Sequence, residues 1–127
     1  MRNLLDTHVV VWLAVNSPKL STTAKQVIFD SSNESFVSIA SAWEVAIKVG
    51  KGNLRLDGGV SEFFNIVYQN GFELLPITEE HVKRLEILPL LHRDPFDRIL
   101  IASALTEGMC LISADTNVPL YDVDSLW

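Results

Sequence analysis

The sequence predicts an α/β fold of three layers, in which helices cover both faces of a short parallel sheet. Short apolar runs typical of strands alternate with longer segments whose apolar residues repeat at helical spacing. The short runs lack polar alternation, which is typical of parallel strands buried on both faces. With 127 residues, 48% of them apolar, we expect one domain over residues 1–127.

The first expected element is a strand over Arg2–Leu5 that stops at Asp6, and Thr7 is a suitable N-cap for a following helix. The segment His8–Val15 is ambiguous from its residues alone. Three consecutive valines favour a strand, whereas the preceding Asp-Thr-His favours a turn and a new element.

A helix capped by Ser21, a buried strand at Phe36–Ser38 and a helix from about Ala40 to Val49 follow. The expected core face of the latter helix consists of Trp43, Ala46, Ile47 and Gly50. The second half adds six elements, which are helix Val60–Gln69, strand Phe72–Ile77, a helix capped by Thr78, helix Pro95–Glu107 and strands Cys110–Ser113 and Leu120–Val123.

Acidic residues follow two of the predicted strands. Asp6 ends the first strand, and Asp115 comes shortly after Cys110–Ser113. Ligands of open α/β sheets collect at the carboxyl ends of the strands, so both carboxylates are expected in one crevice. Glu44 can border that crevice from its helix, and Asp97 lies at the start of the long apolar helix.

Structural explanations compete with these functional ones. Asp94 and Asp97 have the spacing of helix-capping residues, and Glu44 with Lys48 has the i,i+4 spacing of a surface ion pair. Asp115 can form an Asx turn. Asp6 is the hardest to explain in this way, because an aspartate against an apolar strand needs a partner.

Clustered carboxylates repel one another, so either their pKa values rise or a cation lies between them. An all-oxygen donor set suits Mg²⁺ or Mn²⁺. No zinc-type spacing is present, and His8, His81 and His92 are interpreted as surface or capping residues.

Composition restricts the function further. The net charge is −6, but the first 56 residues carry six Lys/Arg against four Asp/Glu, so charge alone does not exclude a nucleic-acid substrate. The longest apolar run, Val9–Val15, is too short to span a membrane, and no secretory signal follows Met1. With Cys110 as the single cysteine, a cytoplasmic location is expected.

Four segments in order resemble the PIN-domain ribonucleases, and most closely the VapC-like toxins of toxin–antitoxin modules. They are LLDTH at residues 4–8, SIASAWEVAIK at 38–48, HRDPFDRILIA at 92–102 and SAD at 113–115. Each segment is weak evidence by itself, whereas the ordered set is specific and spans nearly the whole chain.

The resemblance implies a catalytic set of Asp6, Glu44, Asp97 and Asp115, of which Asp6, Asp97 and Asp115 are the expected metal ligands. It places Thr7 in support of the site and Asp94 nearby, and makes His8–Val15 a helix. It implies cleavage of RNA with Mg²⁺ or Mn²⁺, a homodimer, and neutralisation by a small antitoxin protein. Whether Glu44 binds metal or orients water stays open.

Other functions fit the residues less well. An aspartyl phosphatase needs a second aspartate where His8 stands, and a receiver-like module needs a lysine after a late strand. A PIN-like fold that only binds RNA or its partner is the remaining alternative. Candidate phosphate contacts are Lys48, Lys51, Arg55, Arg93 and Arg98.

Two helices carry more large apolar residues than a small core requires. These residues are Val9, Trp12, Leu13, Phe63, Phe64 and Val67. They are candidates for a surface that binds a second copy or an antitoxin, with burial in the core as the alternative.

Overall fold

The computed structural model describes residues 1–127 and contains a five-stranded, fully parallel sheet in the order β3-β2-β1-β4-β5. The strands are β1 (Arg2–Leu5), β2 (Glu34–Ser38), β3 (Glu73–Leu75), β4 (Cys110–Ile112) and β5 (Ser125–Leu126). The helices are α1 (Thr7–Ala14), α2 (Thr22–Phe29), α3 (Ile39–Gly50), α4 (Gly59–Gln69), α5 (Glu79–Glu86), α6 (Pro95–Glu107) and the 3₁₀ helix η1 (Val118–Leu120).

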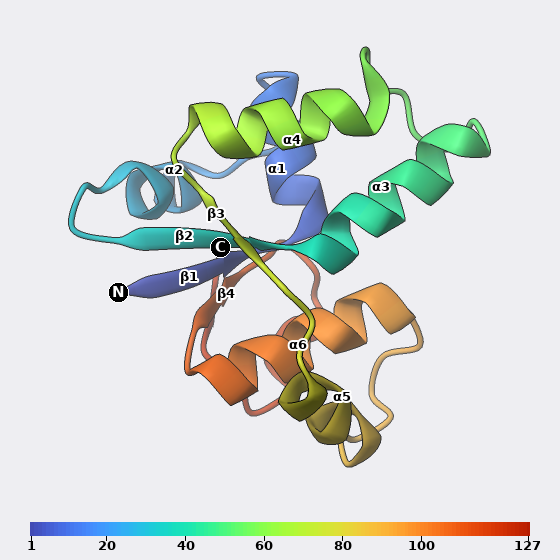
Figure 1. Ribbon diagram of the computed structural model, residues 1–127. Helices are drawn as coiled ribbons and strands as arrows, with labels where there is room; N and C mark the ends of the chain where they lie inside the picture. The colour runs from blue at the N-terminus through green and yellow to red at the C-terminus, as the bar shows by residue number, and fades with distance from the viewer.

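Helices cover both faces of the sheet, so the predicted three-layer α/β fold is confirmed. In Figure 1, α1, α3 and α4 lie above the sheet and α5 and α6 lie below it. Neighbouring residues of one strand pack into opposite layers: Leu5 contacts the core under α1 to α4, and Leu4 contacts the core over α6. None of the helices has the length and apolar character needed to cross a membrane.

The order of the strands brings β1 and β4 together, with Leu5 paired with Ile112. The amide of Asp6 continues this ladder by donating to the Ile112 carbonyl at 3.0 Å. The residues that follow the two strands therefore meet at one edge of the sheet, as the sequence predicted for Asp6 and Asp115.

The segment after Asp6 is helical, as the family resemblance implied. The predicted N-cap is wrong by one residue, because Asp6 occupies the N-cap position and Thr7 is the first helical residue. The backbone of Asp6 is extended with φ −62° and ψ 154°, so the chain turns from strand to helix at this single residue. The Thr7 hydroxyl is thereby free to contact α3.

The predicted core face of α3 is also wrong. Ala42 and Val45 are buried, whereas Trp43 is 61% exposed and Ala46 is exposed. Small residues on the buried face let α3 approach its neighbours closely, and the Trp43 ring instead packs edge-on against Phe96 of α6, with 5.2 Å between ring centroids.

The predicted last strand, Leu120–Val123, is not a strand. Pro119 lacks an N–H and lies within η1, and the chain returns to the sheet only at β5, where the Leu111 amide of β4 donates to the Asp124 carbonyl.

The apolar residues proposed for an association surface are mainly core. Val9, Phe63 and Val67 are fully buried, and the other three, Trp12, Leu13 and Phe64, are half-buried against the same core.

Candidate active site

Three of the four predicted catalytic residues line one hollow of about 340 Å³ at the carboxyl edge of β1 and β4. The residues that line it are Asp6, His8, Val9, Trp12, Lys19, Asp97, Ala114 and Asp115. The structure therefore brings the three predicted metal ligands, Asp6, Asp97 and Asp115, to the same space although they come from three different elements.

Asp6 is buried and only half satisfied. The residue is 5% exposed, and its Oδ2 accepts a 2.6 Å hydrogen bond from the Ser113 hydroxyl. Its Oδ1 is buried and has no hydrogen-bond partner. Burial raises the pKa of Asp6, because the charged form is poorly solvated. An orphaned buried carboxylate oxygen of this kind fits a site that receives a cation.

Asp97 lies in the first turn of α6, where Asp94 is the N-cap. The Asp94 Oδ1 accepts from the amides of Phe96 at 2.8 Å and Asp97 at 3.3 Å, so the capping role predicted for Asp94 is confirmed. Burial, together with the negative charges of Asp6 and Asp94, raises the pKa of Asp97 to about 7. The negative charge around Asp97 is thus not fully offset by positive charge.

Asp115 is the best stabilised of the three. Its Oδ1 accepts from the Asn117 amide at 2.8 Å, which forms the Asx turn considered from the sequence. Burial opposes ionisation, but the hydrogen bonds from the Asn117 amide and from His92 outweigh it and lower the pKa of Asp115.

His92 belongs to the site, so its interpretation as a surface or capping residue is wrong. Its Nε2 lies 2.8 Å from Asp115 Oδ2 and 3.0 Å from Asp97 Oδ2. Burial lowers the pKa of His92, but the hydrogen bond to Asp115 and the charge of Asp97 more than offset this, so the pKa is raised. No spacing rule identifies this residue; the family segment that begins with it was the available signal.

Glu44 stands apart from the hollow. It is 2% exposed, its Oε1 accepts a 2.7 Å hydrogen bond from Thr7, and its Oε2 pairs with Lys48. The Thr7 hydroxyl also lies 2.9 Å from the Ser41 hydroxyl. The predicted i,i+4 pair is therefore present, but its acidic member is buried and links α3 to α1.

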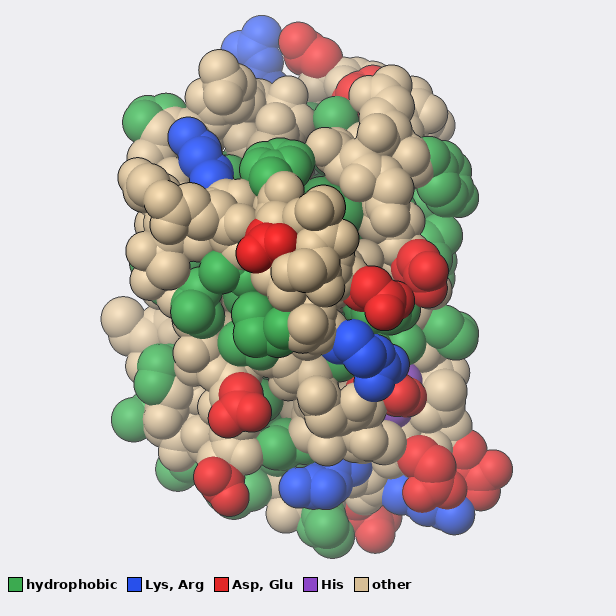
Figure 2. Space-filling view, turned by 90° about the vertical axis from the view of Figure 1, so that its left-hand side faces the viewer, with side chains coloured by type: hydrophobic (Ala, Val, Ile, Leu, Met, Phe, Trp, Pro, Cys, Tyr) green, Lys and Arg blue, Asp and Glu red, His purple; other side chains and the backbone are tan.

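Two of the predicted phosphate contacts have other partners in the structure. Lys48 is paired with Glu44, and Arg98 donates to the carbonyls of Leu88 and Pro89, which makes it a structural residue. Lys19, which the sequence did not single out, lines the hollow. On the face shown in Figure 2, basic side chains are scattered among acidic and apolar ones and form no continuous stripe.

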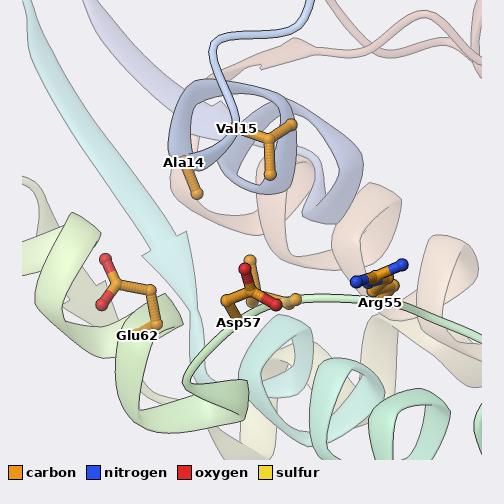
Figure 3. A pocket seen from close by; sticks show the side chains of 6 residues that line it. Ala14, Val15, Arg55, Asp57 and Glu62 are labelled. Atoms are coloured by element: carbon orange, nitrogen blue, oxygen red, sulfur yellow. The ribbon is translucent and has the colours of Figure 1, made fainter.

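A second hollow, of about 550 Å³, lies between the end of α1, the α3–α4 connection and the start of α4. Figure 3 shows Arg55, Asp57 and Glu62 around it, with Ala14 and Val15 on the α1 side. None of the predicted catalytic residues borders this hollow, so its size does not mark it as the catalytic centre.

Comparisons with known structures show the same fold. The chain superimposes on the structure of VapBC2 from Rickettsia felis bound to a promoter DNA fragment, with a TM-score of 0.76, 13% identity, and coverage of 99% of this chain and 98% of that one. For VapBC-1 from nontypeable Haemophilus influenzae, the TM-score is 0.70 at 17% identity, with coverage of 99% and 97%.

FitAcB from Neisseria gonorrhoeae gives a TM-score of 0.66 at 16% identity, with coverage of 98% and 96%. No curated protein matches the sequence. The model of the PIN domain matches residues 4–126. PIN domains are generally nucleases that use divalent metal ions. The match, the parallel sheet and the carboxylates at its edge lead to one conclusion: this chain belongs to the PIN-domain family.

Proposed function

We propose that this protein is a metal-dependent endoribonuclease that acts as the toxin of a toxin–antitoxin pair. The observation that carries the catalytic part is the hollow shared by Asp6, Asp97 and Asp115, in which one buried carboxylate oxygen has no partner. The toxin part is supported by the similarity to solved toxin–antitoxin complexes. In this proposal residues 1–127 form one nuclease domain.

Asp6, Asp97 and Asp115 hold Mg²⁺ or Mn²⁺ in this proposal, and their oxygen donors fit such hard cations. A bound ion supplies Lewis acidity, which lowers the pKa of water and offsets charge on the scissile phosphate. Ser113 orients Asp6, and the Asn117 amide orients Asp115. Lys19, at the rim of the hollow, is placed to contact a phosphate of the substrate.

Glu44 supports the site rather than entering the hollow. Its hydrogen bond from Thr7 fixes the start of α1 next to Asp6, and its pairing with Lys48 keeps a positive charge near the acidic cluster. Glu44 is therefore a positioning residue of the proposed site.

The test is cleavage of labelled RNA and of single-stranded DNA of the same sequence, with Mg²⁺, Mn²⁺ or EDTA. We expect RNA cleavage that requires the ion and falls more than about a hundredfold in Asp97→Asn, because loss of even an outer partner of a metal ligand costs 10- to 100-fold. Undiminished cleavage in EDTA would refute the metal mechanism, and preferential cleavage of DNA would refute the substrate class.

The toxin role is tested separately by expressing the chain alone and together with the neighbouring gene product. We expect growth arrest that the Asp97→Asn change abolishes and that the neighbouring protein relieves by forming a stable complex. A nuclease that neither arrests growth nor binds that protein would be a PIN nuclease of another kind.

A further inference from the structure

We propose that His92 is a positioning residue of the carboxylate site. In this arrangement His92 donates a hydrogen bond from Nε2 to Asp115, lies 3.0 Å from Asp97, and holds these two carboxylates side by side to receive a divalent cation. The inference rests on the proposed function, because it concerns the same metal site.

The backbone of the protein fixes which nitrogen of His92 carries the proton. The Asp94 amide donates a hydrogen bond of 3.1 Å to His92 Nδ1. A ring nitrogen that accepts a hydrogen bond has no proton of its own, so the proton of the neutral ring is on Nε2. A metal ligand needs an unprotonated nitrogen. His92 in this geometry is therefore a hydrogen-bond donor to Asp115 and not a ligand of the ion.

The carboxylates on either side of His92 are close enough to share one cation, because the ligand atoms of His92, Asp97 and Asp115 lie within 4.8 Å of one another. Asp97 Oδ2 and Asp115 Oδ2 both lie within 3.0 Å of His92 Nε2. Ligand oxygens around an octahedral ion with bonds of 2.0–2.1 Å lie about 3 Å apart, so carboxylates must be held close together despite their repulsion. Each carboxylate retains lone pairs that the histidine does not use.

The histidine is itself held firmly. Its side chain is 12% exposed, and the amides of Leu91 and His92 donate to the Tyr121 hydroxyl at 3.0 and 2.8 Å. The same hydroxyl accepts from Arg98 at 3.1 Å. The ring is thus fixed by hydrogen bonds to its backbone and to Nδ1, which is what a residue that orients others requires.

A separate observation points to a cation at the same place. The buried Oδ1 of Asp6, which has no hydrogen-bond partner, belongs to a residue that lines the hollow with Asp97 and Asp115. Asp6 makes no contact with His92 that would explain this unpartnered oxygen. The Asp6 oxygen is therefore a second sign, separate from the carboxylates around His92, that the site lacks a positive charge.

The first experiment reads the tautomer by long-range ¹H–¹⁵N NMR of the metal-free protein at pH 8. We expect a protonated Nε2 and an unprotonated Nδ1 for His92, with Nε2–H protected from exchange. His8, which lines the same hollow and whose ring makes no hydrogen bond, is the reference ring. A His92 ring with its proton on Nδ1 would overturn the proposal.

The second experiment measures Mn²⁺ binding by calorimetry and by electron paramagnetic resonance. We expect His92→Leu to weaken binding about 10- to 100-fold, as loss of an outer partner of a metal ligand does. His92→Gln, whose amide can donate in place of Nε2–H, is expected to recover most of the affinity. Asp57→Asn, at the second hollow, is the control and is expected to change the dissociation constant less than about twofold.

The outcomes separate the two proposals. Two outcomes would overturn the role of His92 while leaving the metal site standing. One is a resonance signal of nitrogen directly bonded to Mn²⁺ that is lost in His92→Gln, and the other is equal Mn²⁺ affinity in the wild-type protein and in His92→Leu. Failure of the wild-type protein to bind Mn²⁺ or Mg²⁺ at all would overturn the metal-dependent function itself.

Discussion

Asp6, at the end of β1, and Glu44, on α3, are almost equally buried, at 5% and 2% exposure. The partners of their carboxylate oxygens nevertheless differ. Both oxygens of Glu44 have partners, one in Thr7 and one in Lys48. One oxygen of Asp6 has none. Burial alone therefore does not distinguish a structural acid from a functional one, whereas the partners of each oxygen do.

The difference follows from where the two residues lie. Glu44 faces α1 from the middle of α3, and its partner Lys48 is one turn away on the same helix. Asp6 stands at the end of a central strand, where the hollow begins and where no Lys or Arg makes an ion pair with it. A buried carboxylate with an unpartnered oxygen and a raised pKa is typical of functional sites.

The difference between Asp6 and Glu44 is tested most directly by removing the charge of each residue while keeping its shape. In EDTA at pH 8, we expect Asp6→Asn to raise the melting temperature, because it removes a poorly solvated charge, and Glu44→Gln to lower it. The loss for Glu44→Gln is about 1.5–3 kcal/mol, the range for a hydrogen bond to a charged group.

Calorimetry of the two variants beside the wild-type protein checks this prediction, with Lys48→Met as the control that removes the other member of the Glu44 pair. Melting temperatures that shift in the same direction for Asp6→Asn and Glu44→Gln would show that the two carboxylates make the same kind of contribution to stability.

The second prediction concerns pH. The pKa of Asp97 is about 7 in the folded protein against an ordinary value of 3.8, so the folded state binds more protons than the unfolded state between these values. The free energy of unfolding of the metal-free protein should therefore fall as pH rises from about 4 to about 7 and then level off. The raised pKa of His92 acts in the same direction at the upper end of this range.

Melting temperatures at pH 5, 6, 7 and 8 in EDTA measure this slope, which should be smaller in Asp97→Asn. Millimolar Mn²⁺ at pH 8 should restore the lost stability, by about 1.4 kcal/mol for each tenfold excess over the dissociation constant. A metal-free protein that is more stable at pH 8 than at pH 5 would contradict the crowding of negative charge at this site.

Much of the fold follows from sequence patterns because local signals and burial agree there. The apolar run Arg2–Leu5 becomes β1, Asp94 with Pro95 begins α6, and Gly108 ends it in a left-handed conformation with φ 66°. The placement of Asp6 and Asp115 beside each other follows from the rule that parallel strands present their carboxyl ends at one edge.

The errors occur where partners distant in sequence decide the outcome. The exposed Trp43 is stabilised by Phe96, and the position of His92 depends on Tyr121. Helical spacing does not tell whether Trp43 or Glu44, which are about 100° apart on α3, is the buried residue. Hydrogen bonds between segments, which carry no periodic signal, made His92 part of the site.

The smallest predicted effect is at Asp94, an acid that borders the site but whose side chain works as a helix cap. Asp94→Asn should leave the melting temperature nearly unchanged, because Asn caps a helix about as well as Asp, whereas Asp94→Ala should cost about 1 kcal/mol. Asp94→Asn also removes one of the charges that raise the pKa of Asp97, so RNA cleavage should persist with its pH profile shifted toward lower pH. Loss of cleavage in Asp94→Asn at an unchanged melting temperature would instead make Asp94 a fourth functional carboxylate, comparable to Asp6 and not to Glu44.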